Sequence, residues 1–196
     1  KGQSPNRLTL EEATLCARTG AIHLAGEPGH AKIQLAAIGA YQTGEAVTAS
    51  ARLAARGAPA CVTAILEPGR LRIARDRLES DFVLDDDALK GLFPSGLARV
   101  LVTHTRPEPM TGLLRRIDGG PDRLRSLGYI SRGGTFDVFG MLFANRCTWA
   151  HIIDAAAALL RRPISDFLNS DERDALAGRG DPRGLEIKRE RSHAKT

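Results

Sequence analysis

The chain has 196 residues, of which 42% are hydrophobic and 26% are charged, and this composition does not favour a disordered protein. No run approaches about 18 consecutive apolar residues, so we expect no membrane partner. The polar start at residues 1–4 predicts no signal peptide, and we expect a cytoplasmic location. Because the chain begins with Lys rather than Met, we expect a processed, engineered or fragmentary product.

The formal net charge is +5, but basic residues are spread along the chain and only 5% of residues are aromatic. A platform for single-stranded nucleic acid needs more aromatic side chains, so we expect no nucleic-acid partner. Anionic small substrates or a coding bias explain the charge better. The cysteines Cys16, Cys61 and Cys147 are widely spaced and form no CxxC pair, which predicts buried reduced thiols.

The first half of the chain alternates between predicted strands and helices. Thr9 as a cap, acidic residues in the first turn and Gly20 as a stop predict a short helix over residues 9–20. A short strand from Ala21 and a turn at residues 27–29 follow. The nearly continuous apolar runs over residues 31–40 and 58–66 predict strands buried on both faces.

Between these two strands, residues 43–57 predict a helix. Its apolar stripe is expected to contain Val47, Ala51 and Ala54, with Leu53 beside them, and Gly57 ends it.

The second half continues the alternation. We expect short helices over residues 70–80 and 85–94, a strand over 98–105, a helix over 107–120 and a strand over 126–134. A final long helix is expected to turn Trp149, Ile152, Ile153, Ala156, Leu159 and Leu160 toward the core, and Pro163 ends it. Residues 163–178 allow one more short helix, and residues 188–196 are expected to fray.

This alternation predicts the α/β class, as an open, mostly parallel sheet of about five strands with helices on both faces. We divide the chain into a lead-in segment (1–20), an α/β domain (21–162) and a partly flexible C-terminal extension (163–196). Ligands of such sheets usually bind at the carboxyl ends of the strands. The segments that follow the predicted strands are therefore the places to search for a site.

Three of these segments carry candidate residues. Gly39 and Thr43 lie in a glycine turn before a helix, where backbone amides can hold a phosphate, although a plain topological turn explains them as well. The turn has no GxGxxG fingerprint and no Walker lysine. His104, Arg106 and Glu108 follow a buried strand, where His104 could move a proton and Arg106 could clamp a phosphate or carboxylate. A capped loop with Arg106 paired to an acid is the structural alternative.

The third segment, residues 131–137, offers Arg132, Gly133 and Gly134 for an anion or a partner chain, while Asp137 is expected to cap a helix. Zinc-ligand spacing is absent among the histidines, and His151, beside the core stripe, is expected to be structural. We therefore expect no metal site and no catalytic residue in this chain alone. The tripeptide 179–181 reads Arg-Gly-Asp, which we attribute to chance.

The order of these elements resembles the C-terminal domain of the transketolase superfamily of thiamin-diphosphate enzymes. The resemblance runs from about Gly20 to Leu160 and rests on three stretches: "GAIHLAGEPGHAKIQLAAIGAYQTGEAVTASARLAARGAPACVTAILEP", "ARVLVTHTRPEPMTGLLRRI" and "LGYISRGGTFDVFGMLFANRCTWAHIIDAAAALL". The usual glycine turn of the family, similar to "GtDGFGrS", reads "GYISRGGTF" here. Transketolase, phosphoketolase-like and homodimeric pyruvate dehydrogenase types all stay open.

The resemblance implies a part of a larger enzyme that acts on ketose phosphates or 2-oxo acids. In the family, thiamin diphosphate and Mg²⁺ sit between an N-terminal and a middle domain and supply the electron sink. This chain has no GDG motif, so we expect it to bind no cofactor alone, to support a homodimer with those domains, and to place His104, Arg106 or Arg132 at the rim of the active site. The alternative is a freestanding α/β module that binds a small phosphorylated ligand.

Overall fold

The computed structural model describes residues 9–130 and 133–187. Its centre is one five-stranded sheet with the order β1-β3-β2-β4-β5. The strands are β1 (Ala21–Ala25), β2 (Ile33–Ile38), β3 (Ala60–Ile65), β4 (Ala98–Thr103) and β5 (Leu124–Leu127). All neighbours pair in parallel except β1, which runs antiparallel to β3 at one edge. The predicted α/β class and mostly parallel sheet are confirmed.

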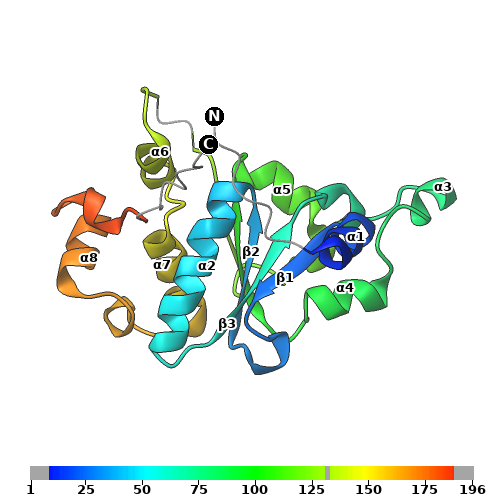
Figure 1. The fold of residues 1–196 in the computed structure, drawn as a ribbon, viewed down its shortest axis with the longest axis horizontal. Helices are drawn as coiled ribbons and strands as arrows, with labels where there is room; N and C mark the ends of the chain where they lie inside the picture. Colours follow the sequence, from blue (N-terminus) through cyan, green and yellow to red (C-terminus); the bar gives the residue numbers. More distant parts are fainter. Residues whose placement is uncertain (1–8, 131–132, 188–196) are drawn as a thin grey trace, which may run out of the picture.

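The sheet is covered on both faces, as Figure 1 shows, with α2, α7 and α8 on one side and α4 and α5 on the other. The helices are α1 (Leu10–Thr19), α2 (Ala40–Ala55), α3 (Arg77–Ser80), α4 (Asp86–Leu92), α5 (Pro107–Leu113), α6 (Val138–Ala144), α7 (Trp149–Leu160) and α8 (Ser170–Leu176). Because β2 and β3 lie under helices on both faces, every residue in them is buried, which explains why their sequences are apolar except for Gln34 and Thr63.

Local signals in the sequence explain several helix ends. Thr9 and Glu12 form a capping box at the start of α1, and Gly20 ends that helix with a φ of 77°. Asp137 accepts a hydrogen bond from the Gly140 amide and caps α6, as predicted. Asp85 likewise caps α4.

The apolar stripe expected on α2 is wrong for three of its four residues, since only Leu53 is buried. Val47, Ala51 and Ala54 face solvent, whereas Ala46, Ala49 and Leu53 are fully buried. The buried face also contains the polar residues Gln42, Glu45 and Ser50. Because those polar residues interrupt the apolar pattern, the alanines and Val47 suggested the wrong side of the helix.

Three boundaries also differ from the prediction. Only residues 77–80 of the segment 70–80 are α-helical, because Asp76 caps a new helix there and the chain before it leaves a short 3-10 turn, Pro68–Leu71. Helix α5 ends at Leu113 and continues as a 3-10 turn over Arg115–Ile117. The last strand covers residues 124–127 rather than 126–134, since the chain after Leu127 leaves the sheet toward the loop that follows β4.

Residues 163–187, which we assigned to a C-terminal extension, pack against the α2 and α7 layer. Phe167, Leu168 and Leu185 are almost completely buried there. Arg52 of α2 binds Glu172 through two hydrogen bonds of 2.8 and 2.9 Å, and the Trp149 indole N–H donates to the Leu185 carbonyl at 2.8 Å. This part of the extension therefore contributes to the same core as the helices of the domain.

The opposite face contains a buried polar network near the amino ends of the strands. The Gln34 amide donates to the Thr63 hydroxyl and to the Leu92 carbonyl, both at 2.7 Å. The buried Arg99 guanidinium donates to the Gln34 side-chain oxygen at 2.7 Å, to the Ile117 carbonyl and, at 3.3 Å, to the Pro94 carbonyl. Two backbone carbonyls, that of Ile117 at the end of a 3-10 turn and that of Pro94 just after α4, thus replace a carboxylate as partners of this cation.

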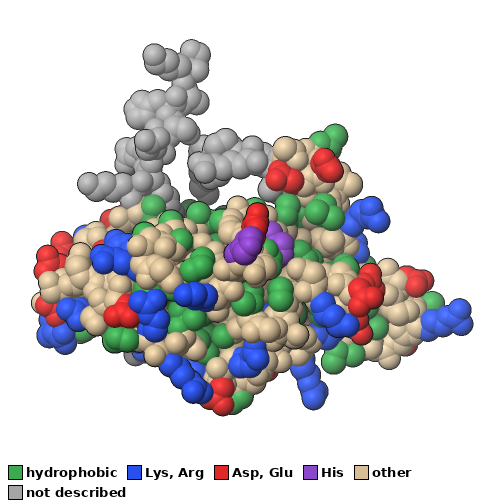
Figure 2. Space-filling model, turned by 90° about the horizontal axis from the view of Figure 1, so that it is seen from below, with side chains coloured by type: hydrophobic (Ala, Val, Ile, Leu, Met, Phe, Trp, Pro, Cys, Tyr) green, Lys and Arg blue, Asp and Glu red, His purple; other side chains and the backbone are tan. Residues whose placement is uncertain are grey.

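The cysteines and the distribution of surface charge match what the sequence predicted. Cys16, Cys61 and Cys147 are buried free thiols, as predicted. Seen from below, Lys and Arg side chains alternate with acidic and apolar ones on that face (Figure 2). Within the described residues, no helix is both long and apolar enough to cross a bilayer.

Candidate functional site

The candidate site lies at the carboxyl ends of β2, β4 and β5, where three loops meet. After β2, Gly39 takes a φ of 110° and starts α2, a conformation that disfavours any side chain. A Cβ at Gly39 would lie 3.1 Å from Nδ1 of His104, so the absence of a side chain lets the loops after β2 and β4 approach closely. The His104 amide donates to the Ile38 carbonyl at 3.1 Å.

The loop after β5 is held against the loop after β4. Tyr129 donates its amide to the Thr105 carbonyl at 2.9 Å, and Ile130 donates its amide to the Asn145 side-chain oxygen at 2.6 Å. Gly128 permits this approach, because a Cβ there would lie 2.5 Å from the Thr105 carbonyl oxygen. The two loops therefore form one rim above the sheet.

This rim encloses a small pocket of about 80 Å³. The pocket is lined by Tyr41, Gln42, Thr103, His104, Tyr129, Met141, Leu142, Asn145 and Cys147. Its opening is formed by Tyr41, His104 and Tyr129, all exposed, while Gln42, Thr103 and Cys147 are buried. Pockets for ligands the size of a sugar phosphate are usually about 300–1,000 Å³, so this pocket alone holds only a small group.

Neither Cys147, which lines the pocket, nor the nearby Glu45 is set up for a reaction. Burial, and to a smaller extent the charge of Glu45, raises the pKa of the Cys147 thiol to about 12. The buried Glu45 carboxylate accepts a hydrogen bond of 2.8 Å from the Trp149 amide at the start of α7. Because a thiol with such a pKa stays protonated near neutral pH, Cys147 serves packing and not nucleophilic attack.

The structure brings together only some of the predicted site residues. Gly39 and His104 adjoin each other, and the Thr43 hydroxyl donates to the Gly39 carbonyl at 2.9 Å, within the first turn of α2. Arg106 occupies the position before α5 and is exposed, and its guanidinium forms no hydrogen bond or ion pair within the described part of the chain. The expected pairing of Arg106 with an acid is therefore not observed there.

The third segment contributes less. Arg132 lies outside the described residues. Gly133 and Gly134 are exposed, with φ values of 73° and 89°, so this turn depends on glycine. The carboxylate of Asp137 forms an ion pair with Arg183 at 2.7 Å in addition to its capping bond, and these contacts lower its pKa. Asp137 therefore has a structural role.

Sequence reasoning missed Tyr41, Tyr129 and Asn145. Tyr41 directly follows the glycine turn, and its position after a buried strand was the available signal. Tyr129 and Asn145 line the same pocket only because the chain after β5 returns to the end of α6, where Ile130 donates to Asn145. No spacing in the sequence shows that arrangement.

The same edge exposes a group of large apolar side chains, which we call the apolar rim. Its members come from α2, the loop after β5 and the start of α6, and are Tyr41, Tyr129, Ile130, Phe136 and Val138, with exposed fractions between 36% and 52%. Monomeric proteins rarely leave large contiguous apolar areas in water. Within the described residues, no group of three or more His, Cys, Asp or Glu side chains can hold a metal ion.

No protein-family model matches the sequence, and no curated protein matches it significantly. Solved structures do match the fold. A transketolase variant from Pichia stipitis superposes with a TM-score of 0.55 at 17% identity over 79% of this chain. Transketolases from Leishmania mexicana and Campylobacter jejuni give TM-scores of 0.54 and 0.53, both at 14% identity, over 75% and 72% of this chain.

The fold and the loops at its carboxyl edge define an open α/β sheet domain. More specifically, the chain has the fold of a transketolase C-terminal-like domain, as its sequence predicted. It covers 19% of the length of each of the three transketolase chains.

Proposed function

We propose that this chain is the C-terminal, non-cofactor-binding domain of a thiamin-diphosphate-dependent, transketolase-like enzyme. In the proposal, other domains hold thiamin diphosphate and Mg²⁺, and the enzyme acts on ketose phosphates or 2-oxo acids as a homodimer. The carboxyl edge of the sheet faces those domains or the partner subunit, and the cationic residues beside it attract the anionic substrate.

One observation carries the proposal: the carboxyl edge combines the apolar rim with a pocket of only about 80 Å³. An edge of this kind is typical of a surface that another domain covers, because exposed aromatic side chains gain free energy when they are buried. The matched Pichia stipitis enzyme has been solved with xylulose 5-phosphate and with sedoheptulose 7-phosphate, which supports the ketose phosphate class.

The role proposed for this chain is to bind and orient. Arg106 is exposed, and within the described residues its guanidinium has no internal partner, so this group is available for a phosphate or carboxylate. His104 is fixed through hydrogen bonds from its amide and its Nδ1 atom to the Ile38 carbonyl, at 3.1 and 3.2 Å. That contact makes Nδ1 the protonated nitrogen and leaves Nε2 as an acceptor toward a substrate hydroxyl.

The first experiment determines the size of the native polypeptide by immunoblot with an antibody against this domain. We expect a band several times larger than 21.1 kDa. That larger polypeptide is then assayed for thiamin-diphosphate-dependent turnover of xylulose 5-phosphate and of 2-oxo acids. A native band near 21.1 kDa with no associated partner would contradict the proposal.

The role of Arg106 is tested in the same enzyme. Arg106→Ala should raise KM by about tenfold and change kcat much less, because the contact is made equally in the ground state and the transition state. Arg56→Ala, at the opposite end of α2, is the matched control and should change neither constant. An unchanged KM for Arg106→Ala would remove this residue from the substrate rim.

The freestanding ligand-binding module is the alternative. It predicts that sugar phosphates raise the melting temperature of this chain alone in a saturable way. A flat melting temperature together with turnover by the larger polypeptide would favour the enzyme domain.

A further inference from the structure

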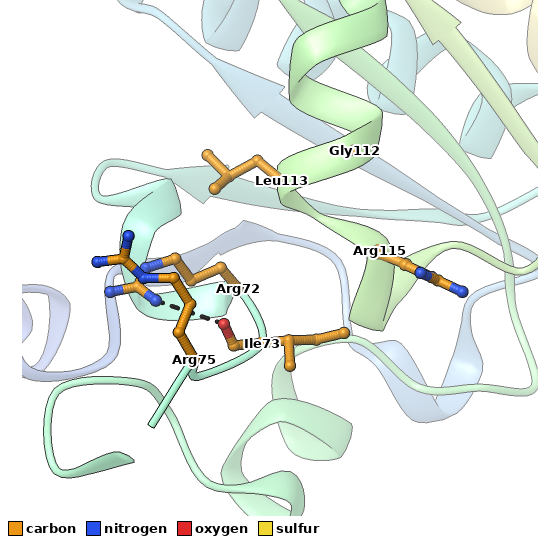
Figure 3. Close-up of a pocket in the computed structure, with 6 residues that line it drawn as sticks. All are labelled: Arg72, Ile73, Arg75, Gly112, Leu113 and Arg115. Carbon is orange, nitrogen blue, oxygen red and sulfur yellow. Dashed lines mark hydrogen bonds between the residues drawn. The ribbon is translucent and has the colours of Figure 1, made fainter. Parts of the chain in front are cut away.

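A second hollow lies on the α5 side of the sheet and shares no lining residue with the pocket at the carboxyl edge. Its volume is about 510 Å³, within the usual range for small-molecule sites. We call it the arginine groove, and its lining residues are Arg72, Ile73, Arg75, Gly112, Leu113 and Arg115 (Figure 3). The loop before α3 supplies one wall, and the end of α5 supplies the other.

Positive charge is in excess at this groove. Arg72 and Arg75 lie next to each other in Figure 3 and both bind the Glu79 carboxylate. Arg115 lies on the other side with its side chain directed outward, and within the described residues its guanidinium has no partner. Even with the charge of Asp76, which also acts on Arg75, three guanidinium groups face two carboxylates.

Arg72 and Arg75 keep N–H donors that these contacts do not use. Arg75 uses its Nε and one terminal nitrogen on Glu79, which leaves the other terminal nitrogen of this exposed side chain without a partner among the described residues. Two adjacent guanidinium groups with free N–H donors suit the oxygens of a phosphate, which accept several hydrogen bonds at once.

Between the cationic ends, the groove is apolar. The Ile73 side chain is 56% exposed, and Leu113 of α5 lies across from it. Gly112 carries no side chain, and a Cβ there would meet nothing within 4 Å, so the wall beside Leu113 is open. A carbon skeleton or a flat ring can therefore lie between Ile73 and Leu113.

We propose that the arginine groove binds an organic phosphate, with its phosphate on Arg72 and Arg75 and its apolar part between Ile73 and Leu113. Arg115 turns inward to pair with a second anionic group or to cover the ligand. This site is separate from the proposed rim of the active site, so it stands or falls independently of the proposed function.

Calorimetric titration of the chain with ADP tests the proposal, at about 50 mM salt so that charge interactions are not heavily screened. ADP should bind saturably with a dissociation constant of about 1 mM or below. Arg75→Gln should weaken ADP binding about tenfold, and Arg115→Gln, which loses no internal contact, about threefold. Arg77→Gln removes the same charge from the neighbouring helix α3, outside the groove, and should leave binding unchanged.

Pyrophosphate distinguishes an organic phosphate from a bare anion. Ile73→Ser should weaken ADP binding and leave pyrophosphate binding unchanged, because only ADP has an apolar part. The proposal is overturned if ADP shows no saturable binding up to about 10 mM, or if Arg75→Gln and Arg115→Gln both bind ADP like the unaltered chain. Equal affinity for both ligands, with Ile73→Ser silent, would also overturn it.

Discussion

The two ends of the sheet differ in how completely their polar and apolar groups are satisfied. Near the amino ends, the side chains of Gln34, Thr63 and Arg99 form a buried network in which the donors find acceptors. At the carboxyl ends, aromatic side chains such as Tyr129 and Phe136 remain about half exposed around a small pocket. The same sheet is thus closed at one end and open at the other.

This difference indicates that the closed end contributes mainly to stability and the open end mainly to assembly. The closed end is satisfied within the chain, because the Arg99 guanidinium donates to the Ile117 carbonyl in the 3-10 turn after α5 and to the Pro94 carbonyl just after α4. The open end leaves apolar area that a neighbouring domain would bury. We therefore expect substitutions at the closed end and in the core to affect stability, and substitutions at the open end to affect assembly.

The largest loss of stability is expected for Trp149→Ala in the core. Trp149 is 6% exposed, its indole N–H donates to Leu185, and the Arg52 guanidinium lies 5.0 Å above its ring. The substitution should lower the free energy of unfolding by about 3–5 kcal/mol, measured by urea denaturation. Trp149→Phe keeps most of the packing and should cost about 1–2 kcal/mol. A near-neutral Trp149→Ala would show that the helix is not held through this residue.

Arg99→Met tests the closed end directly. It leaves the Gln34 side-chain oxygen and the Ile117 carbonyl without their donor, so unfolding should become easier by about 2–4 kcal/mol. The double variant Arg99→Met with Gln34→Leu should lose less than the sum of the single variants, since one orphaned acceptor is removed. Strict additivity would mean that the network does not act as a unit.

A third prediction concerns pH. Burial, and then the charge of Arg146, lowers the pKa of His151 to about 4, and its Nδ1 atom lies 2.8 Å from the Thr148 hydroxyl. Because the unfolded chain takes up a proton below pH about 6.5 and the folded chain does not, stability falls as the pH falls through this window. The loss between pH 7 and pH 5 should be about 2 kcal/mol.

Urea denaturation at several pH values measures this slope. His151→Gln should reduce it, while His30→Gln, at an exposed position, should leave it unchanged. An unaltered slope in His151→Gln would assign the acid sensitivity to other groups.

The central strands and several helix ends were predictable from the sequence, because their signals are local. The apolar runs of β2 and β3, the capping residues Thr9 and Asp85, and the glycine stop at Gly20 each act within a few residues. The buried face of α2 was not predictable in this way. Its Glu45 and Ser50 look like surface residues, and their partners Trp149 and Ala60 lie far along the chain or on another element.

For the open end, the sequence predicted which loops would form the site but not all of the residues that line it. The rule that ligands gather at the carboxyl ends of strands indicated the segments that contain Gly39 and His104. It did not indicate Tyr129 or Asn145, because they line one pocket only through the way the chain returns after β5, where the Ile130 amide donates to Asn145. Long-range contacts of this kind leave no periodic pattern in the sequence.

The smallest effect on stability is expected at the apolar rim. This prediction tests most directly whether the open end of the sheet differs from the closed end. Phe136→Ser and Tyr129→Ser change side chains that are 52% and 44% exposed, so each should alter the free energy of unfolding by about 0.5 kcal/mol or less. If the rest of the enzyme covers this edge, the same variants should reduce the dimer fraction and the turnover of the full-length polypeptide, measured by analytical ultracentrifugation and by assay. Val47→Ser removes a similarly exposed apolar side chain, 40% exposed, from the solvent face of α2 and serves as the control.

Rim variants that unfold the isolated chain would show that the edge is already part of its core. Rim variants that assemble and turn over normally would show that the edge faces water, and the open end would then have to be explained by a ligand rather than by a domain.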